Sequence, residues 1–209
     1  MRLYVFGAGS HGRELAWLAR EIHGPSLEVV FLVDDERYVT APVHGDPVRL
    51  LTDDIEPGGQ YVVALGDAGL RRQAASACER AGLTAATLVH PRVERSERVD
   101  IGPGSVIAAG SVLTTDITIG RHVHVNIGCT ISHDAVLGDF ATLAPGVKLA
   151  GNVSIGSGAF LGIGATVIDG RTGDPLVIGA DAVVAAGACV TVPVAPRTLV
   201  AGVPAAQKR

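Results

Sequence analysis

An aliphatic residue returns at every sixth position between residues 101 and 167, and this period constrains the fold more than any other feature of the sequence. The positions are Ile101, Ile107, Leu113, Ile119, Val125, Ile131, Leu137, Leu143, Leu149, Ile155, Leu161 and Val167. A small or β-branched residue follows four positions after most of them, for example at Ser105, Cys129 and Ala135. Neither an α-helix nor an ordinary strand has this period, whereas a parallel β-helix stacks such residues into columns. The sequence therefore predicts a parallel β-helix.

The repeat also predicts which residues stack, because about eighteen residues form one three-sided turn of the coil. We assign the repeat domain to residues 92–209. The period breaks after Val167 and resumes at Ile178, which places an insertion loop at residues 173–177. After Pro193 the period is lost, and residues 195–209 are expected to form a non-repetitive tail.

The first part of the chain, residues 1–91, alternates strand-like and helix-like segments. The expected strands are Leu3–Phe6, Val29–Val33 and Tyr61–Leu65, and the expected helices are Arg13–His23 and Leu70–Ala81. This alternation is typical of a parallel sheet with crossover helices, whose ligands bind at the carboxyl ends of the strands. The predicted fold is thus a small α/β Rossmann-like domain followed by a β-helix.

The expected strand ends carry residues suited to binding a phosphorylated ligand. They are Gly9, Ser10, His11 and Gly12 after the first strand, Asp34 and Asp35 after the second, and Gly66 after the third. Glycines before a helix let backbone N–H groups approach a phosphate at the positive helix end. A dinucleotide, a nucleotide diphosphate and a purely structural turn all fit this pattern. The shortness of the domain argues against a whole dinucleotide and favours a nucleotide diphosphate.

The main catalytic candidate in the repeat is His133. It occupies the third position of its six-residue unit, which points outward at a corner, and Thr115 and Gly151 lie one coil away on either side. An imidazole with a pKa of about 6.5 can take a proton from an attacking amine or hydroxyl at neutral pH. The neighbouring Asp134 could orient the ring and stabilise its cation. A catalytic His133–Asp134 pair and an ordinary solvated corner are both compatible with the residues alone.

Two further histidines raise the alternative of a zinc site shared between subunits of a β-helix trimer. His122, His124 and His133 occupy three different positions of their units, so they do not line one row. No metal is therefore expected, and His122 and His124 are interpreted as solvated turn residues.

Composition excludes several other classes of function. A net charge of −4 offers no basic face for nucleic acid. The sequence lacks an apolar run long enough for a membrane span and lacks a recognisable signal peptide, so a cytoplasmic protein is expected. Cys78, Cys129 and Cys189 have neither zinc-site nor disulfide spacing.

Several motifs together resemble the sialic acid O-acetyltransferase and nucleotide-linked 4-amino-sugar N-acetyltransferase family. They are the segments Gly9–Gly12, Phe31–Asp35, Ala64–Asp67, His90–Pro91, Asn126–Asp134, Leu149–Val153, Phe160–Ile163 and Gly202–Ala205. The resemblance implies a homotrimer of left-handed β-helices with acetyl-CoA in the groove between neighbours. A left-handed coil would be an exception to the usual handedness of crossovers.

The resemblance also implies a role for individual residues. His133 corresponds to the general base and Asp134 to the acidic residue that orients it. Gly151 would offer its N–H to the thioester carbonyl, where negative charge develops. The N-terminal loop and Asp34 would hold the nucleotide. The remaining implied contacts are Asn126 at the acceptor, and Ile163 and Ala186 along the coenzyme.

The implied activity is acetyl-CoA-dependent acetylation of the amino group of a nucleotide-linked amino-deoxy sugar by direct transfer. An O-acetyltransferase acting on sialic acid or a related sugar is the first alternative. A non-catalytic, sugar-binding trimeric scaffold is an alternative of another class. The sequence departs from some family members at Thr142, where a second histidine can occur, and in the insertion.

Overall fold

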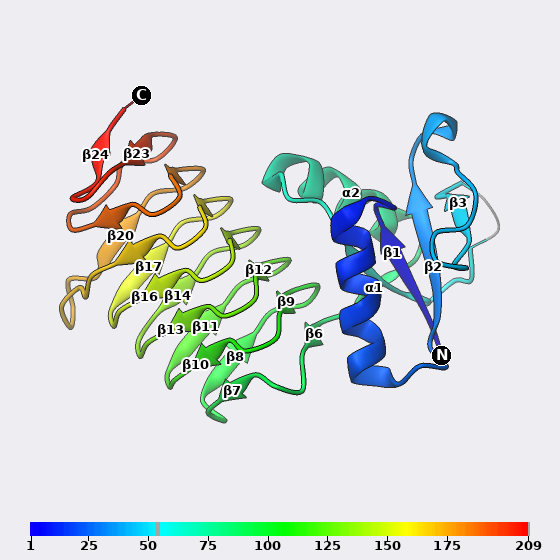
Figure 1. Cartoon of the computed structure of the whole chain (residues 1–209), viewed down its shortest axis with the longest axis horizontal. Helices are drawn as coiled ribbons and strands as arrows, with labels where there is room; N and C mark the ends of the chain where they lie inside the picture. Colours follow the sequence, from blue (N-terminus) through cyan, green and yellow to red (C-terminus); the bar gives the residue numbers. More distant parts are fainter. Residues whose placement is uncertain (53–54, 209) are drawn as a thin grey trace. The chain divides into compact units, whose positions relative to one another are not determined.

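The computed structural model describes residues 1–52 and 55–208. The chain divides into two compact units, Met1–His90 and Pro91–Arg209, which differ in architecture (Figure 1). Within the described residues, no helix combines the length and apolar character needed to cross a bilayer.

The first unit is built on a five-stranded parallel sheet with the order β3-β2-β1-β4-β5. Its strands are β1 (Arg2–Phe6), β2 (Glu28–Val33), β3 (Val48–Leu50), β4 (Gln60–Val63) and β5 (Thr84–Ala85). The short strand β6 (Leu88–Val89) ends the unit. The chain moves outward from β1 in one direction through β2 and β3, and in the other through β4 and β5. A crevice for ligands is therefore expected at the carboxyl ends of β1 and β4, where the strand order reverses.

Two helices and a short 3₁₀ segment connect these strands: α1 (Ser10–His23), α2 (Ala68–Arg80) and η1 (Glu36–Tyr38). Helix α2 begins earlier than the apolar pattern indicates because the Asp67 carboxylate accepts the Leu70 N–H at 2.8 Å and caps the first turn. Helix α1 ends where the Gly24 N–H donates to the Arg20 carbonyl at 2.8 Å. Both predicted helices are present, each with an additional N-terminal segment.

The second unit is a parallel β-helix with three sheets. The first sheet contains β7 (Glu94–Arg95), β10 (Val112–Leu113), β13 (Thr130–Ile131), β16 (Lys148–Leu149), β19 (Thr166–Val167) and β22 (Cys189–Val190). The second contains β8 (Val99–Ile101), β11 (Ile117–Ile119), β14 (Val136–Leu137), β17 (Val153–Ile155) and β20 (Leu176–Ile178). The third runs through β9 (Val106–Ile107), β12 (His124–Val125), β15 (Thr142–Leu143), β18 (Phe160–Leu161), β21 (Val183–Val184), β23 (Leu199–Ala201) and β24 (Ala206–Gln207).

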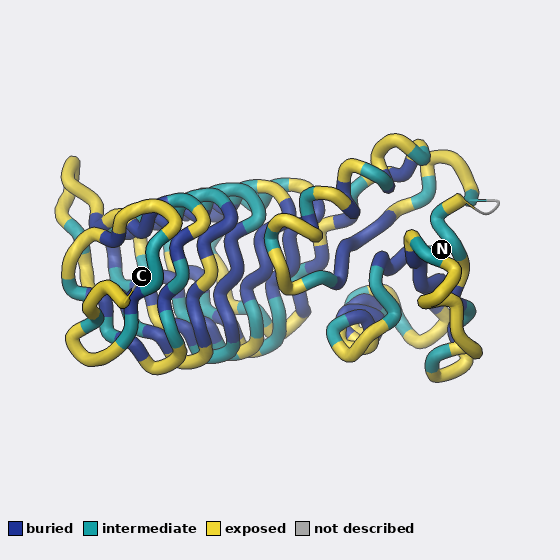
Figure 2. Tube along the Cα trace, turned by 90° about the horizontal axis from the view of Figure 1, so that it is seen from above, coloured by how far each residue is buried: buried dark blue, intermediate teal, exposed yellow. Residues whose placement is uncertain are grey.

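The strand register confirms the predicted stacking. Leu113 pairs with Ile131, Ile131 with Leu149, and Leu149 with Val167, so the aliphatic side chains form a column inside the coil. The repeated positions from Ile107 to Val167 are buried, and Figure 2 shows the buried segments recurring along the coil. Burial of these side chains supplies the main stabilisation of the unit.

The position of the insertion differs from the sequence-based prediction. Residues 173–177 were expected to leave the coil, but Leu176 pairs with Val153 and Val177 with Ser154 in the strand ladder. The extra residues are instead 171–175, which form a small excursion closed by reciprocal backbone hydrogen bonds of 2.9 Å between Arg171 and Asp174. The register shifts because a strand must place its inward residues two apart, so both Leu176 and Ile178 have to stay in the coil.

The tail is also more regular than expected. Within the predicted tail 195–209, β23 continues the third sheet by pairing in parallel with β21, and β24 folds back antiparallel onto β23. Val194 forms an isolated parallel bridge with Ile178. The tail therefore covers the last coil with paired backbone, and β24 becomes the edge strand of the third sheet.

Candidate active site and nucleotide pocket

One corner of the β-helix carries the catalytic candidates. Asp116, Asp134 and Asn152 occupy equivalent corner positions on successive coils, with φ of 54°, 59° and 55°. Asp and Asn are among the few non-glycine residues that tolerate this left-handed conformation. The residues just before them form a second column, in which Thr115, His133 and Gly151 follow one another.

His133 and Asp134 form a close side-chain pair at this corner. The Nδ1 atom of His133 lies 2.8 Å from Oδ2 of Asp134, and the two side chains are 57% and 55% exposed. An ionised carboxylate can only accept a hydrogen bond, so this contact places the ring proton on Nδ1. The Nε2 lone pair is then available to accept a proton.

Gly151 packs directly against the His133 ring. A Cβ atom at Gly151 would overlap the Cε1 and Nε2 atoms of His133, so only glycine leaves room for the ring in this orientation. The Asn152 N–H donates to the His133 carbonyl at 2.9 Å and holds the two coils together. Gly151 is a buried residue, and none of the described residues accepts a hydrogen bond from its N–H. A backbone N–H without a protein acceptor is able to bind a ligand oxygen.

The two coils before His133 carry charged residues that the sequence did not single out. Arg98 donates from Nε to Oδ1 of Asp116 at 2.6 Å, and its Nη2 also contacts Oδ1. The Thr115 hydroxyl donates to Oδ2 of Asp116 at 3.0 Å. In the sequence Asp116 resembles an ordinary turn residue, and only the stacking of coils places it next to the His133 corner.

The other predicted active-site residues lie at a different corner of the same chain. Asn126 follows β12 and is half-buried, with its backbone N–H donating to the Leu143 carbonyl at 2.9 Å. Ile163 is 62% exposed and lies beside the coil that carries Ala186, because its carbonyl accepts the Gly187 N–H at 2.8 Å. A single chain thus brings Ile163 and Ala186 together but separates them and Asn126 from His133.

His122 and His124 are not the solvated turn residues that the sequence suggested. Both are buried, and the His122 ring stacks on Phe140 with 5.1 Å between ring centroids. A Cβ at Gly104 would overlap the other side of the His122 ring. Within the described residues, no group of His, Cys, Asp and Glu side chains is arranged to hold a metal ion.

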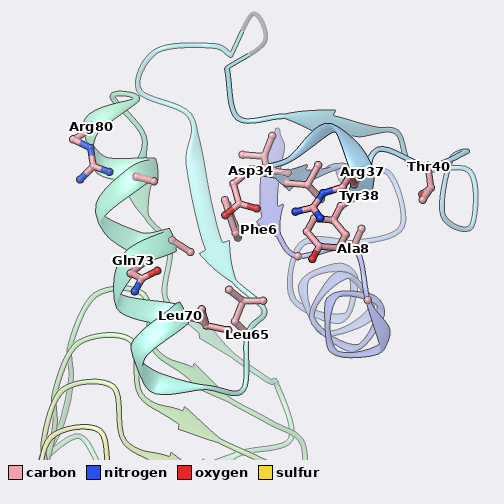
Figure 3. A pocket seen from close by; sticks show the side chains of 16 residues that line it. Phe6, Ala8, Asp34, Arg37, Tyr38, Thr40, Leu65, Leu70, Gln73 and Arg80 are labelled. Atoms are coloured by element: carbon pink, nitrogen blue, oxygen red, sulfur yellow. The ribbon is translucent and has the colours of Figure 1, made fainter.

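The first unit contains a cavity of about 720 Å³ at the carboxyl ends of the sheet strands (Figure 3). Its lining residues come from β1 and the following loop, the end of β2, the η1 segment, the end of β4, and α2. They are Phe6, Gly7, Ala8, Gly9, Leu32, Val33, Asp34, Arg37, Tyr38, Thr40, Leu65, Leu70, Gln73, Ala74, Ala77 and Arg80. The volume and the mixed polar and apolar lining suit a ligand of nucleotide size.

Of the predicted nucleotide-binding residues, only Gly9 and Asp34 line this cavity. Gly12 has a packing role instead, because a Cβ there would overlap the Gly7 carbonyl oxygen. Asp35 caps η1 through the Arg37 N–H at 2.9 Å and also pairs with the Arg37 guanidinium at 2.7 Å. These hydrogen bonds lower the pKa of Asp35.

The remaining predicted loop residues also make local contacts outside the cavity. Ser10 is near the Arg13 guanidinium, with 3.4 Å from Oγ to Nη2. His11 Nδ1 lies 3.0 Å from a carboxylate oxygen of Glu14. The Gly66 carbonyl accepts the buried Arg71 guanidinium at 3.1 Å, and burial lowers the pKa of Arg71 to about 10.

The structure adds cavity residues that the sequence did not indicate. Figure 3 shows Asp34 and Phe6 between the η1 segment, with Arg37 and Tyr38, and the helix that carries Gln73. The sequence contains one signal for the α2 residues. Gln73 and Arg80 are polar and lie seven positions, or two turns, apart, so they share one face of the helix. The η1 segment has no periodic pattern from which its contribution could be predicted.

Comparison with known proteins identifies relatives that match over most of the chain, whereas no family model matches it. A GDP-perosamine N-acetyltransferase from Escherichia coli O157:H7 is 33% identical over 190 residues, covering 86% of this chain and 84% of the relative. The acetyltransferase domain of PglB from Neisseria gonorrhoeae FA1090 aligns with a TM-score of 0.89 and 32% identity over 99% of both chains. That domain has also been solved in complex with acetyl coenzyme A.

A third similar protein is PerB from Caulobacter crescentus, solved in complex with CoA and GDP-perosamine. It aligns with a TM-score of 0.86 and 29% identity, covering 100% of this chain and 98% of PerB. The likeness to these proteins extends over both units of the chain.

Proposed function

Because the chain belongs to the hexapeptide-repeat family of nucleotide-linked amino-sugar N-acetyltransferases, we propose that its acceptor is a GDP-linked amino sugar of the perosamine type. The enzyme transfers an acetyl group from acetyl-CoA to the amino group of a nucleotide-linked sugar. The GDP moiety is inferred from the relatives that act on or bind GDP-perosamine.

The observation that carries the mechanism is the His133–Asp134 contact above Gly151. The sugar amine attacks the thioester carbonyl carbon while Nε2 of His133 takes the amine proton. The carbon–sulfur bond then breaks, CoA leaves as the thiolate, and the imidazolium returns the proton to sulfur. Proton transfer to His133 is general-base catalysis worth about 10² to 10⁴ in rate, and Asp134 supports it by holding the Nδ1 proton and stabilising the transient cation.

We assign the oxyanion contact to the Gly151 N–H. Negative charge develops on the thioester oxygen as the amine adds, and a fixed backbone donor stabilises this charge more than it stabilises the neutral carbonyl. The recorded lack of an acceptor for this N–H among the described residues supports the assignment. No covalent enzyme intermediate is required.

We infer that the first unit acts as a Rossmann-like nucleotide-binding domain and that its cavity holds the nucleotide. The Gly7–Gly9 loop precedes α1, whose N-terminus favours a diphosphate. Asp34 follows β2, where an acidic residue can accept hydrogen bonds from ribose hydroxyls. Tyr38 offers an aromatic surface for the base.

We further propose a homotrimer of left-handed β-helices with active sites between subunits. The separation of Ile163 and Ala186 from His133 within one chain supports this arrangement, because a neighbouring subunit could bring the two corners together. Ile127 and Ile163 are exposed apolar residues on the same corner column, which suits contact with a subunit or with the pantetheine arm.

An acceptor screen tests the proposed function. The full-length enzyme is incubated with acetyl-CoA and GDP-perosamine, a UDP-linked 4-amino sugar, GDP-mannose or free sialic acid, and free thiol is measured. We expect turnover with the amino sugars and a higher kcat/KM for the GDP-linked one. Thiol release with only the hydroxyl acceptors would favour O-acetylation, and absence of coenzyme binding would favour a non-catalytic scaffold.

Asp34→Ala in the full chain tests the nucleotide cavity. We expect KM for the nucleotide sugar to rise at least tenfold while KM for acetyl-CoA stays within about twofold, because only the acceptor loses a hydrogen-bonding partner. Asp181→Asn, which alters a carboxylate in the β-helix, serves as the matched control. An unchanged KM for the nucleotide sugar in Asp34→Ala would contradict the assignment of Asp34 to the nucleotide site.

A further inference from the structure

The corner of the β-helix that carries His133 also carries an ion pair built from two earlier coils. Arg98 approaches Oδ1 of Asp116 with Nε at 2.6 Å and with Nη2, while the Thr115 hydroxyl holds Oδ2 at 3.0 Å. The Arg98 backbone N–H donates to the Ser96 hydroxyl at 2.9 Å. The Asp116 carboxylate therefore has a defined orientation even though it lies at the surface.

The strand register places this carboxylate directly next to the catalytic pair. Thr118 pairs with Val136, so Asp116 and Asp134 occupy the same corner on adjacent coils. The Asp134 N–H donates to the Thr115 carbonyl at 3.3 Å. Because adjacent strands are about 4.8 Å apart, the backbones of Asp116 and Asp134 lie roughly one strand spacing from each other.

The electrostatics of Asp116 agree with this geometry. Its pKa is lowered first by the Arg98 hydrogen bond and then by the Thr115 hydrogen bond, and the charges of Arg98 and His133 lower it further. Interaction with His133 is reciprocal, so the charge state of Asp116 must affect protonation of His133.

We propose that Asp116 and Arg98 are positioning residues that together set the proton affinity of His133. Asp116 stabilises the imidazolium that forms during transfer, and Arg98 limits this effect so that the ring is not held in its charged form before the amine arrives. This inference rests on the proposed role of His133 as the general base. The pair acts by charge, through His133, without contacting the reacting atoms.

The other groups around His133 bind the ring directly, carry no charge or lie far from it. Asp134, on the same turn, binds Nδ1 directly. The next coil contributes Gly151 and Asn152, which are uncharged. The next charged residues in the His133 column are Glu97 and Asp169, each two coils from His133, and both are exposed to solvent. Surface charges two coils away are strongly screened, whereas the Arg98 guanidinium reaches Asp116 on the coil adjacent to His133.

Two substitutions with opposite expected effects test the proposal. Asp116→Asn leaves the Arg98 charge uncompensated, so the titration midpoint of His133 should fall. Arg98→Gln leaves the Asp116 charge uncompensated, so the midpoint should rise. Coulomb's law at about one strand spacing in a high-dielectric environment predicts a fall on the order of half a pH unit for Asp116→Asn and a smaller rise for Arg98→Gln, whose charge lies further from His133. The double variant should return close to the wild-type midpoint.

The midpoint is measured by NMR of the histidine ring protons in the full-length protein, with the His133 signal assigned by its loss in His133→Asn. Asp181→Asn, a like change of charge at another corner, controls for net charge and should leave the midpoint unchanged. Shifts of opposite sign support the proposal. Shifts of the same sign, or midpoints that stay within about 0.1 unit of wild type in both single variants, would overturn it.

The pH profile of kcat/KM separates this proposal from the proposed function. If His133 is the base, the acidic limb of the profile should move by the same amount and in the same direction as the NMR midpoint in each variant. Opposite NMR shifts with an unmoved acidic limb would uphold the coupling and contradict the assignment of His133 as the base. Circular dichroism verifies that both variants retain the β-helix.

Discussion

At the scale of single residues, the absence of a side chain at Gly151 determines where the His133 ring lies. Gly151→Ala should reduce kcat by at least tenfold, because the added methyl group occupies the space of the His133 ring and forces the base out of line. The backbone of Gly151 needs no left-handed conformation, so the fold should persist. Steady-state kinetics and a thermal melt check both expectations.

A double-mutant cycle isolates the cause of this effect. If the methyl group acts through the His133 ring, then Gly151→Ala should lower Tm in the wild-type background. It should have little effect on Tm in His133→Ala, where the ring is absent. The same loss of Tm in both backgrounds would show that the methyl group clashes with something other than the ring.

Buried thiols provide a second test at this scale. Burial raises the pKa of Cys78 to about 12 and that of Cys129 to about 11. Because the thiolate is the reactive form, a raised pKa means that these cysteines should resist iodoacetamide at pH 8 in the folded protein. The partly exposed Cys189 should react first. Mass spectrometry of alkylated peptides, with and without denaturant, measures the difference; rapid labelling of Cys78 without denaturant would contradict its burial.

Some of the residue-level picture could be predicted from the sequence. The six-residue period placed His133 outward with Gly151 one coil away, and the strand ends placed Asp34 near a ligand cavity. Tyr38 could not be predicted, because its position depends on the non-repetitive η1 segment. Asp116 was not predicted because a single aspartate at a corner resembles an ordinary turn residue. Its relation to His133 depends on the stacking of coils.

At the scale of structural elements, the excursion at residues 171–175 is separable from the coil. Removing 171–175 joins Gly170 to Leu176 and restores the six-residue period between Val167 and Ile178. We expect this deletion variant to fold with a Tm within a few degrees of wild type, since surface loops contribute few core contacts.

Deletion of residues 173–177 provides a control of the same length. This variant would place Arg171 and Thr172 in the strand positions of Leu176 and Val177, and Leu176 is buried. Its Tm should fall strongly, because a cation would replace a buried aliphatic side chain. Equal stability of the two deletion variants, measured by differential scanning fluorimetry, would contradict the observed register.

The strengths and failures of prediction at this scale have a physical explanation. The long periodic segment predicted the column of stacked residues because each six-residue unit buries its aliphatic residue in the same way. The sequence places the insertion two residues too far along the chain because the six-residue period marks only Ile178 as back in the coil, whereas strand alternation also requires Leu176. Strand β23 was missed because the spacing from Val190 to Val200 does not follow the six-residue period.

At the scale of the whole molecule, the alternating segments and the six-residue repeat predicted two domains, and the net charge argued against a nucleic-acid-binding surface, but none of these features indicates how many chains form the active site. If the site is shared between subunits, the enzyme should have a mass of about three times 21.4 kDa by light scattering. Ile163→Glu should weaken coenzyme binding or assembly, because it places a charge on an exposed apolar corner. Fully active monomers would contradict a shared site.

The central claim is that the β-helix presents His133 as the base for acetyl transfer to a nucleotide-linked amino sugar. It is tested most directly by the turnover of His133→Asn with saturating acetyl-CoA and GDP-perosamine, alongside calorimetric titration of both substrates. We predict that kcat falls by at least 10² while both dissociation constants stay within about threefold of wild type. Turnover within threefold of wild type in this variant would contradict the claim.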